Sequence, residues 1–249
     1  MHIDLNADVG EGCGDDAALL RWVSSASIAC GGHAGGEASM REALRLCRLH
    51  GVAAGAHPSY LDPEHFGRRE LDWRGLPVAE QMAAQIENLQ ALAREEGVTL
   101  RHVKPHGALY NQAAREPELA ALIARTVRRL DPQLALYGLA GSALTAAARQ
   151  AGLRAVQEAF ADRAYQDGLS LLPRSQPGSL LHEPEAAIAQ VLRALRQQVL
   201  IDHQGRRWPL QADSFCLHGD SQDAAQLAAR LHDGLRQAGV RLLSPSVDT

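Results

Sequence analysis

SASIACGGHAGGEASMREALRLCRLHGVAAGAHP, residues 25–58, contains the pattern that repeats along the whole chain. Runs of small and apolar residues at Ser25–Cys30 and Val52–Ala56 predict two strands, and apolar residues at helical spacing over Met40–Leu49 predict a helix between them. A strand, a helix and a second strand in this order form a βαβ unit, whose two strands run parallel. This stretch therefore predicts an α/β fold with a parallel sheet.

The same alternation continues on both sides of residues 25–58. Further strands are predicted at His2–Val9, Leu100–Pro105, Leu134–Leu139, Ala155–Ala161 and Phe215–His218. Further helices are predicted at Ala79–Glu95, Glu118–Leu130, Ala143–Ala151, Glu185–Gln197 and Asp223–Ala238. We expect one domain over residues 1–249, a length that suits an α/β barrel of about 250 residues.

Three segments depart from this alternation. Pro58–Pro77 and Arg163–Pro184 are rich in Pro, Gly or charge and follow predicted strands, so we expect long βα loops that cover a site. Asp202–Trp208 predicts a hairpin with Gln204–Gly205 at its turn.

The composition excludes several classes of protein. Lys and Arg total 25 and Asp and Glu total 29, which gives a formal net charge of −4 and argues against binding to nucleic acid or to an anionic membrane. With 46% hydrophobic residues, a disordered chain is excluded, and with ten aromatic residues the core must be aliphatic. The four cysteines form no CxxC pair, and the chain shows neither a signal peptide nor an apolar run of membrane-spanning length. We expect reduced thiols and a cytoplasmic location.

Ionisable residues gather where the predicted strands end. Sites in α/β folds form at the carboxyl ends of parallel strands, and residues two apart on a strand share a face. Four such sets share faces: Asp4, Asn6 and Asp8; His102, Lys104 and His106; Glu158 and Asp162; His218 and Asp220. Because a barrel interior is normally filled by aliphatic layers, we expect these sets to line its open mouth.

Lys104 stands out because the chain has 24 arginines and this single lysine. Such a bias suggests a position where a guanidinium cannot substitute. A compact ammonium can share or lose a proton, which a permanently charged guanidinium cannot. We therefore predict a functional role for Lys104.

Four of the eleven histidines lie at strand ends beside Gly or Pro and are predicted at the site: His33, His57, His106 and His218. His102 is deeper, and the sequence leaves open whether it supports the site or only fills the core. Five carboxylates are candidate bases or ion ligands: Asp8, Glu11, Glu158, Asp162 and Asp220. Asp8, His33 and His57 fit a metal triad, but the sequence alone does not separate this from a metal-free acid/base cluster.

The motifs in this order resemble one family over nearly the whole chain. They are DLNADVGEG, IACGGHAGG, GAHPSY, FGRRE, HVKPHGALYN, GLAGS, EAFADRAY and CLHGD. This series is similar to that of the LamB/YcsF family, whose members are the A subunit of bacterial ATP-dependent 5-oxoprolinase. The resemblance implies a seven-stranded (β/α) barrel related to the glycoside hydrolase/deacetylase barrels. It also implies cleavage of 5-oxo-L-proline to L-glutamate with hydrolysis of ATP, performed together with subunits B and C.

This reaction suggests roles for the candidates. Lys104, Arg163 or a Mg²⁺ ion would stabilise charge, while Asp8, Glu11, Glu158 or Asp162 would transfer protons with His33, His57 or His106. Asn6, Arg163, His218 and Asp220 would bind the substrate or orient water. No P-loop is present, because GxxxxGK[ST] needs a lysine between Gly and Ser or Thr and the single lysine of the chain does not lie in such a motif, so ATP would be held in another way or by a partner. Two alternatives stay open: a metal-dependent amide or carbohydrate deacetylase, and a non-catalytic lactam-binding subunit.

Overall fold

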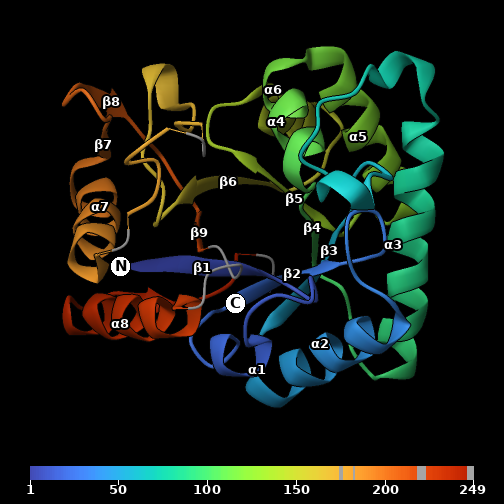
Figure 1. The fold of residues 1–249 in the computed structure, drawn as a ribbon, viewed down its shortest axis with the longest axis horizontal. Coiled ribbons are helices and arrows are strands. Elements are labelled where there is room, and N and C mark those ends of the chain that lie inside the picture. The colour runs from blue at the N-terminus through green and yellow to red at the C-terminus, as the bar shows by residue number, and fades with distance from the viewer. Residues whose placement is uncertain (174–175, 182, 218–222, 246–249) are drawn as a thin grey trace.

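A closed barrel of seven parallel strands forms the centre of the protein (Figure 1). The computed structural model describes residues 1–173, 176–181, 183–217 and 223–245. The barrel strands are β1 (His2–Val9), β2 (Ser25–Ala29), β3 (Ala53–His57), β4 (His102–Val103), β5 (Ala135–Leu139), β6 (Ala155–Phe160) and β9 (Ser214–Leu217). Each pairs with the next in this order, and β9 pairs with β1 to close the ring. The predicted seven-stranded (β/α) barrel is therefore confirmed.

Helices surround the barrel (Figure 1). They are α1 (Asp16–Leu19), α2 (Glu37–His50), α3 (Val78–Glu95), α4 (Gly107–Arg115), α5 (Pro117–Leu130), α6 (Ala143–Gln150), α7 (Pro184–Gln197) and α8 (Ala224–Gln237). Short 3₁₀ turns occur at Pro63–His65, Trp73–Gly75 and Asp167–Leu169. The sequence patterns missed α1 and α4 because each is too short to show a clear apolar period. Among the described residues, no helix combines the length and apolar character needed to cross a membrane.

Two small sheet elements complete the fold. Strands β7 (Val199–Ile201) and β8 (Arg207–Pro209) pair antiparallel, which confirms the predicted hairpin. Strand β10 (Arg241–Leu242), which was not predicted, pairs with the first residues of β1. Both long predicted loops are present, between β3 and α3 and between β6 and α7.

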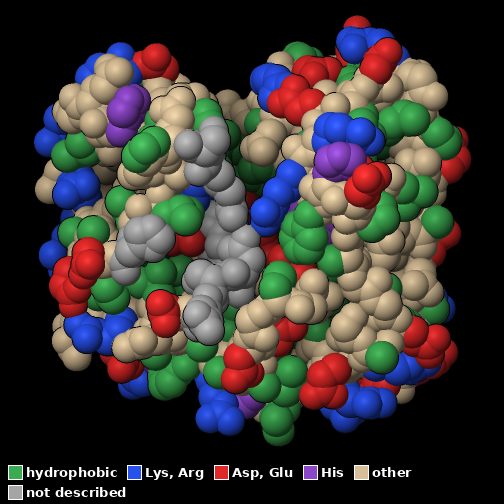
Figure 2. All heavy atoms as spheres, in the orientation of Figure 1, with side chains coloured by type: hydrophobic (Ala, Val, Ile, Leu, Met, Phe, Trp, Pro, Cys, Tyr) green, Lys and Arg blue, Asp and Glu red, His purple; other side chains and the backbone are tan. Residues whose placement is uncertain are grey.

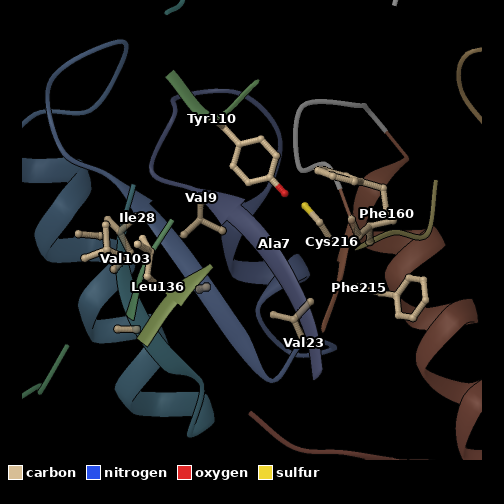
Figure 3. Close-up of a cluster of buried hydrophobic side chains, with 14 of the residues drawn as sticks. Ala7, Val9, Val23, Ile28, Val103, Tyr110, Leu136, Phe160, Phe215 and Cys216 are labelled. Atoms are coloured by element: carbon tan, nitrogen blue, oxygen red, sulfur yellow. The ribbon is translucent and has the colours of Figure 1, made fainter. Parts of the chain in front are cut away.

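The aliphatic core lies between the barrel and its helices. Cross-strand register aligns Val9, Ile28, Ala56, Val103 and Leu136 on one face, and all five are buried; Figure 3 labels each of them except Ala56. Because side chains alternate between the faces of a strand, the neighbouring residues point into the barrel.

The barrel interior is polar, which corrects the expectation that polar residues line only the open mouth. Asp4 is completely buried, and it accepts hydrogen bonds from the hydroxyls of Ser24 (2.6 Å), Ser25 (2.7 Å), Ser214 (2.6 Å) and Tyr137 (3.0 Å). Burial raises the pKa of Asp4. These hydrogen bonds replace the water that the carboxyl loses, so a polar group is tolerated where aliphatic side chains are usual.

His102 occupies the middle of this interior. Its Nε2 lies 3.3 Å from Ser27 Oγ, and its ring centroid lies 4.4 Å from that of Tyr137. Gly55 on the neighbouring strand leaves room for the ring, because a Cβ at that position would lie 2.3 Å from it. Burial, with a smaller effect from Lys104, lowers the pKa of His102 to about 3, so the imidazole is neutral. His102 therefore fills the barrel beneath the candidate site.

Candidate active site

The carboxyl ends of the strands bring together side chains that are far apart in the sequence. Asp8 comes from the end of β1, His57 from β3, Lys104 from just after β4, and Glu158 from β6. The register of the strands explains part of this assembly. Asp8 of β1 lies opposite Ser27 of β2, and Asn6 of β1 lies opposite Cys216 of β9, so the register places residues of three strands side by side. The site therefore lies at the end of the barrel where parallel α/β folds place their sites.

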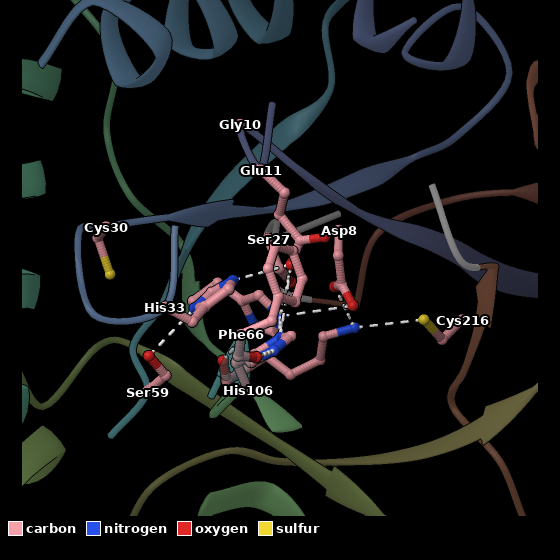
Figure 4. A network of polar contacts seen from close by, with 12 residues as sticks. Asp8, Gly10, Glu11, Ser27, Cys30, His33, Ser59, Phe66, His106 and Cys216 are labelled. Atoms are coloured by element: carbon pink, nitrogen blue, oxygen red, sulfur yellow. Dashed lines mark hydrogen bonds and ion pairs between the residues drawn. The ribbon is translucent and has the colours of Figure 1, made fainter. Parts of the chain in front are cut away.

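Lys104 is the centre of the first cluster, of which Figure 4 labels Asp8 and Cys216, and only 2% of Lys104 is exposed. Its Nζ lies 2.6 Å from Asp8 Oδ1 and 3.1 Å from Glu158 Oε1. It also donates to Asn6 Oδ1 at 2.9 Å and lies 3.3 Å from Cys216 Sγ. The buried ammonium of Lys104 thus lies against two carboxylates. A charge removed from water needs such partners of opposite charge.

The contact between Asp8 and Lys104 shifts the pKa of both side chains. Burial alone would raise the pKa of Asp8, but its interactions with His57 and Lys104 hold it well below the usual value. Burial alone would lower the pKa of Lys104, but the nearby charge of Asp8 is the largest of the effects that raise it well above the usual value. At neutral pH, Asp8 is therefore a carboxylate and Lys104 an ammonium.

A second cluster, Glu11 with His33, His57 and His106, lies beside the first (Figure 4 labels Glu11, His33 and His106). One ligand atom from each of the four residues lies within 4.8 Å of the others, so the cluster can hold a metal ion. Glu11 Oε1 lies 2.9 Å from His33 Nε2, 3.4 Å from His106 Nδ1 and 4.0 Å from His57 Nε2. Asp8, the carboxylate of the triad considered from the sequence, pairs with Lys104 and lies 3.4 Å from His57 Nε2.

The β3–α3 loop closes over the histidines because two glycines allow close contact. Gly107 has φ +56°, and a Cβ there would lie 2.4 Å from the Gly67 carbonyl oxygen. Gly67 has φ +63°, and a Cβ there would lie 2.9 Å from His33 and 3.1 Å from His106. The rings of His33 and His106 stack with centroids 3.6 Å apart, and the Phe66 ring meets both edge-on. Burial lowers the pKa of both His33 and His106, so these imidazoles are neutral.

A cavity of about 800 Å³ opens above both clusters. The β6–α7 segment lines one side and α4 the other, and Figure 2 shows the hollow between these parts of the surface. Arg68, Arg115 and Arg163 are among the lining residues. So are Tyr110 and Glu158, whose Oη and Oε2 atoms are buried without a hydrogen bond of normal geometry among the described residues. The cavity therefore combines cations with buried polar atoms that can bind a ligand.

The remaining predicted residues lie outside the two clusters. Asn6 is completely buried beneath Lys104, where its Nδ2 donates to Glu158 Oε1 at 2.9 Å. Asp162 is buried and does not line the described cavity, whereas Arg163 lines it and donates to the carbonyl of Leu172. His218 and Asp220 lie outside the described residues.

Sequence reasoning missed three residues of the site. Cys216 was not among the predicted site residues, although it lies on the predicted strand Phe215–His218. Tyr110 lies on α4, which was not predicted, and one turn after His106. Phe66 lies in a loop, where no periodicity indicates the direction of a side chain.

The fold and site define a (β/α) barrel with a polar, titratable centre at the carboxyl ends of its strands. The model of the LamB/YcsF family matches residues 3–248, so the chain belongs to this family. A solved structure of a lactam utilization protein from Thermus thermophilus is similar, with 42% identity and a TM-score of 0.90, covering 98% of this chain and 99% of that one.

Two more distant structures also match over most of the chain. A protein proposed to cleave cellobiose phosphate, from Enterococcus faecalis, has 13% identity and a TM-score of 0.57, covering 98% of this chain and 97% of that one. That likeness shows the fold alone. A family 4 carbohydrate esterase from Streptomyces lividans has 15% identity and a TM-score of 0.44, covering 97% of this chain and 91% of that one. A likeness at that level carries no inference about chemistry.

Proposed function

We propose that this chain is the A subunit of an ATP-dependent 5-oxoprolinase and opens the lactam ring of 5-oxo-L-proline together with subunits B and C. Membership of the family and the 42% identity to a lactam utilization protein support a role in lactam utilisation. The observation that carries the proposal is Lys104, an ammonium held by Asp8 and Glu158 against a cavity lined by arginines. This arrangement suits an amide whose oxygen gains negative charge during the reaction.

The lactam is a resonance-stabilised amide, so the reaction needs activation. Phosphoryl transfer from ATP to the lactam oxygen would release ADP and make the ring carbon electrophilic. One water would then add to that carbon, the C–N bond would break, and the nitrogen would take up a proton. A second water would release phosphate from the resulting acyl phosphate and leave L-glutamate. The sequence of steps consumes one ATP and two waters.

The residues suit these steps. Lys104 would stabilise the oxygen that accepts the phosphoryl group, and Asp8 would keep the ammonium in place. Glu158, whose Oε2 is buried without a described hydrogen-bond partner and whose side chain lines the cavity, would accept a proton from the attacking water. Burial and the nearby charge of Glu158 raise the pKa of Tyr110 well above its usual value, so the phenol stays protonated and can donate to the leaving nitrogen.

The phosphates of ATP need cations that the chain does not provide through a P-loop. Arg68, Arg115 and Arg163 line the cavity and would attract a phosphoryl group. The partner subunits would contribute the rest of the nucleotide site, so we expect little activity from the isolated chain.

The test is an assay of the chain produced together with subunits B and C, measuring ADP and glutamate formed in response to 5-oxoproline. Lys104→Arg keeps the charge but replaces the compact ammonium with a larger planar group, and we expect at least a 100-fold loss of turnover, about 3 kcal/mol. Arg129→Lys, on the exposed face of α5, is the reciprocal control and should keep full turnover. Near-normal turnover of Lys104→Arg, or no glutamate from the wild-type complex, would overturn the proposal.

A metal-dependent amide or carbohydrate deacetylase is the second candidate, because Glu11 and the three histidines can hold a metal ion. The two functions differ in their need for ATP. Hydrolysis of an amide or acetylated sugar by the isolated chain without ATP, abolished by a chelator, would favour this candidate over the first.

A further inference from the structure

The direction of two hydrogen bonds decides which nitrogens of His57 and His106 carry protons. His57 Nδ1 lies 2.7 Å from the carbonyl oxygen of Lys104, and His106 Nε2 lies 3.0 Å from that of Phe66. A carbonyl can only accept, so both of these nitrogens are donors. In rings that carry a single proton, the other nitrogens, His57 Nε2 and His106 Nδ1, therefore have the lone pairs, and they face each other at 3.0 Å.

His33 is held in the same way. Its Nδ1 lies 3.1 Å from Ser59 Oγ, whose own hydrogen is donated to the Tyr60 carbonyl at 2.9 Å. Ser59 Oγ therefore accepts from His33, which leaves the lone pair on Nε2, 2.9 Å from Glu11 Oε1. Gln85 fixes Ser59 by accepting from its N–H at 3.0 Å and donating to its carbonyl at 2.8 Å.

Four electron-pair donors thus converge on one point without a hydrogen between them. A single added proton would form a hydrogen bond between only two of these atoms, and the lone pairs of the other two would still repel their neighbours. A metal ion satisfies all four at once, because each donor presents a lone pair toward the centre. Outer N–H groups that donate to backbone carbonyls or a hydroxyl are also the usual support of metal-bound imidazoles.

We propose that Glu11, His33, His57 and His106 bind one divalent transition-metal ion. Three imidazole nitrogens and one carboxylate oxygen suit Zn²⁺, Co²⁺, Ni²⁺ or Fe²⁺ rather than Mg²⁺ or Ca²⁺, which prefer oxygen ligands. Four of the six separations between these atoms are 2.9–4.0 Å, which fits ligands placed about 2.0–2.1 Å from one ion, and all six are within 4.8 Å.

The position of this centre gives it access to ligands. Glu11, His57 and His106 line the cavity, so an ion there could exchange with solvent and reach a bound substrate. Phe66 packs edge-on against two of the rings, and its backbone is held at φ +53°, a conformation uncommon for a residue with a side chain. That conformation directs the carbonyl that fixes His106, as expected where the backbone serves a site.

The test is metal binding by the full chain, independent of any activity. We expect metal analysis of the purified protein to find about one equivalent of a transition metal, and the chelated protein to rebind Zn²⁺ or Co²⁺ at a single site. Co²⁺ should give the visible absorption bands of a nitrogen-rich site of low coordination number. Because this readout needs no substrate, its failure is separate from failure of the proposed 5-oxoprolinase reaction.

Three variants define the ligands. Ser59→Ala leaves every ligand in place but removes the acceptor for His33, so Co²⁺ should bind about 10–100-fold more weakly. His106→Ala removes a ligand and should weaken binding further and shift the Co²⁺ bands. His50→Ala, on the exposed end of α2, should bind like the wild type. Absence of saturable binding in the wild type, or an affinity and spectrum unchanged in both Ser59→Ala and His106→Ala, would overturn the proposal.

Discussion

Replacing Lys104 with Met tests whether one cation holds the centre of the barrel together. The variant keeps an unbranched apolar stem but removes the ammonium, which lies 2.6 Å from Asp8 Oδ1 and 3.1 Å from Glu158 Oε1. Two buried carboxylates then lose their counter-charge. Breaking a buried ion pair from one side costs about 3–5 kcal/mol. For a chain of 249 residues this corresponds to a fall of about 6–10 °C in Tm.

The pH dependence gives the prediction a second test. The folded pKa of Asp8 is lowered, so its ionised form contributes stability above the unfolded pKa of about 3.9, and this is lost as the pH falls through the folded pKa. The folded pKa of Lys104 is raised, so its contribution is complete below about 10.4 and is lost only as the pH rises through the folded pKa. The difference between the wild type and Lys104→Met should therefore be largest at about pH 5–9 and shrink toward pH 3.

The assay is urea unfolding across this pH range, followed by circular dichroism. Arg129→Met on the exposed face of α5 is the matched control, and it should change the free energy of unfolding by less than about 0.5 kcal/mol. Adding Asp8→Asn to Lys104→Met should recover part of the loss, because the amide needs no counter-charge. A loss below about 1 kcal/mol at pH 7, or an equal loss at pH 3.5, would refute the electrostatic account.

Two further predictions test the packing of the barrel and the state of its thiols. Gly55→Ala places a Cβ 2.3 Å from the buried His102 ring, so we expect a loss of about 1–3 kcal/mol in urea unfolding, whereas Gly75→Ala, with nothing within 4 Å, should be near neutral. An equal effect of the two changes would contradict the packing account. Cys13 is half-buried while the other three thiols are buried, so a thiol reagent should modify one cysteine rapidly in the native chain, and Cys13→Ser should abolish that phase. Rapid modification of a second thiol would show that the native barrel opens.

The alternation of strands and helices was readable from the sequence because each element carries its own period. Strand alternation also placed Asp4, Asn6 and Asp8 on one face of β1, as the structure confirms. Composition singled out Lys104, and flanking Gly or Pro selected His33, His57, His106 and His218 among eleven histidines. These are local properties, so neighbouring residues suffice to predict them.

The sequence could not predict which residues of different strands come into contact across the barrel. The sequence offered Asp8 as the partner of His33 and His57, whereas the fold places Asp8 beside Lys104 and His57 and brings Glu11 to His33. Glu11 lies in a loop after β1, where no period predicts the direction of its side chain. The depth of Asp4 inside the barrel was equally hidden, because its three serine partners and Tyr137 are supplied by other segments.

The sequence by itself determined the order of the elements, the faces of the strands and the residues able to carry chemistry. Only the tertiary structure decided which of these residues meet, because that depends on closure of the barrel between β1 and β9 and on the β3–α3 loop folding over His106. Closure sets the stagger of the strands, and thereby the height of each side chain above its neighbours. Lys104 and His106 were predicted on the same face of one segment. In the structure, Lys104 joins the cluster of Asp8 and Glu158, whereas His106 joins the cluster of Glu11, His33 and His57.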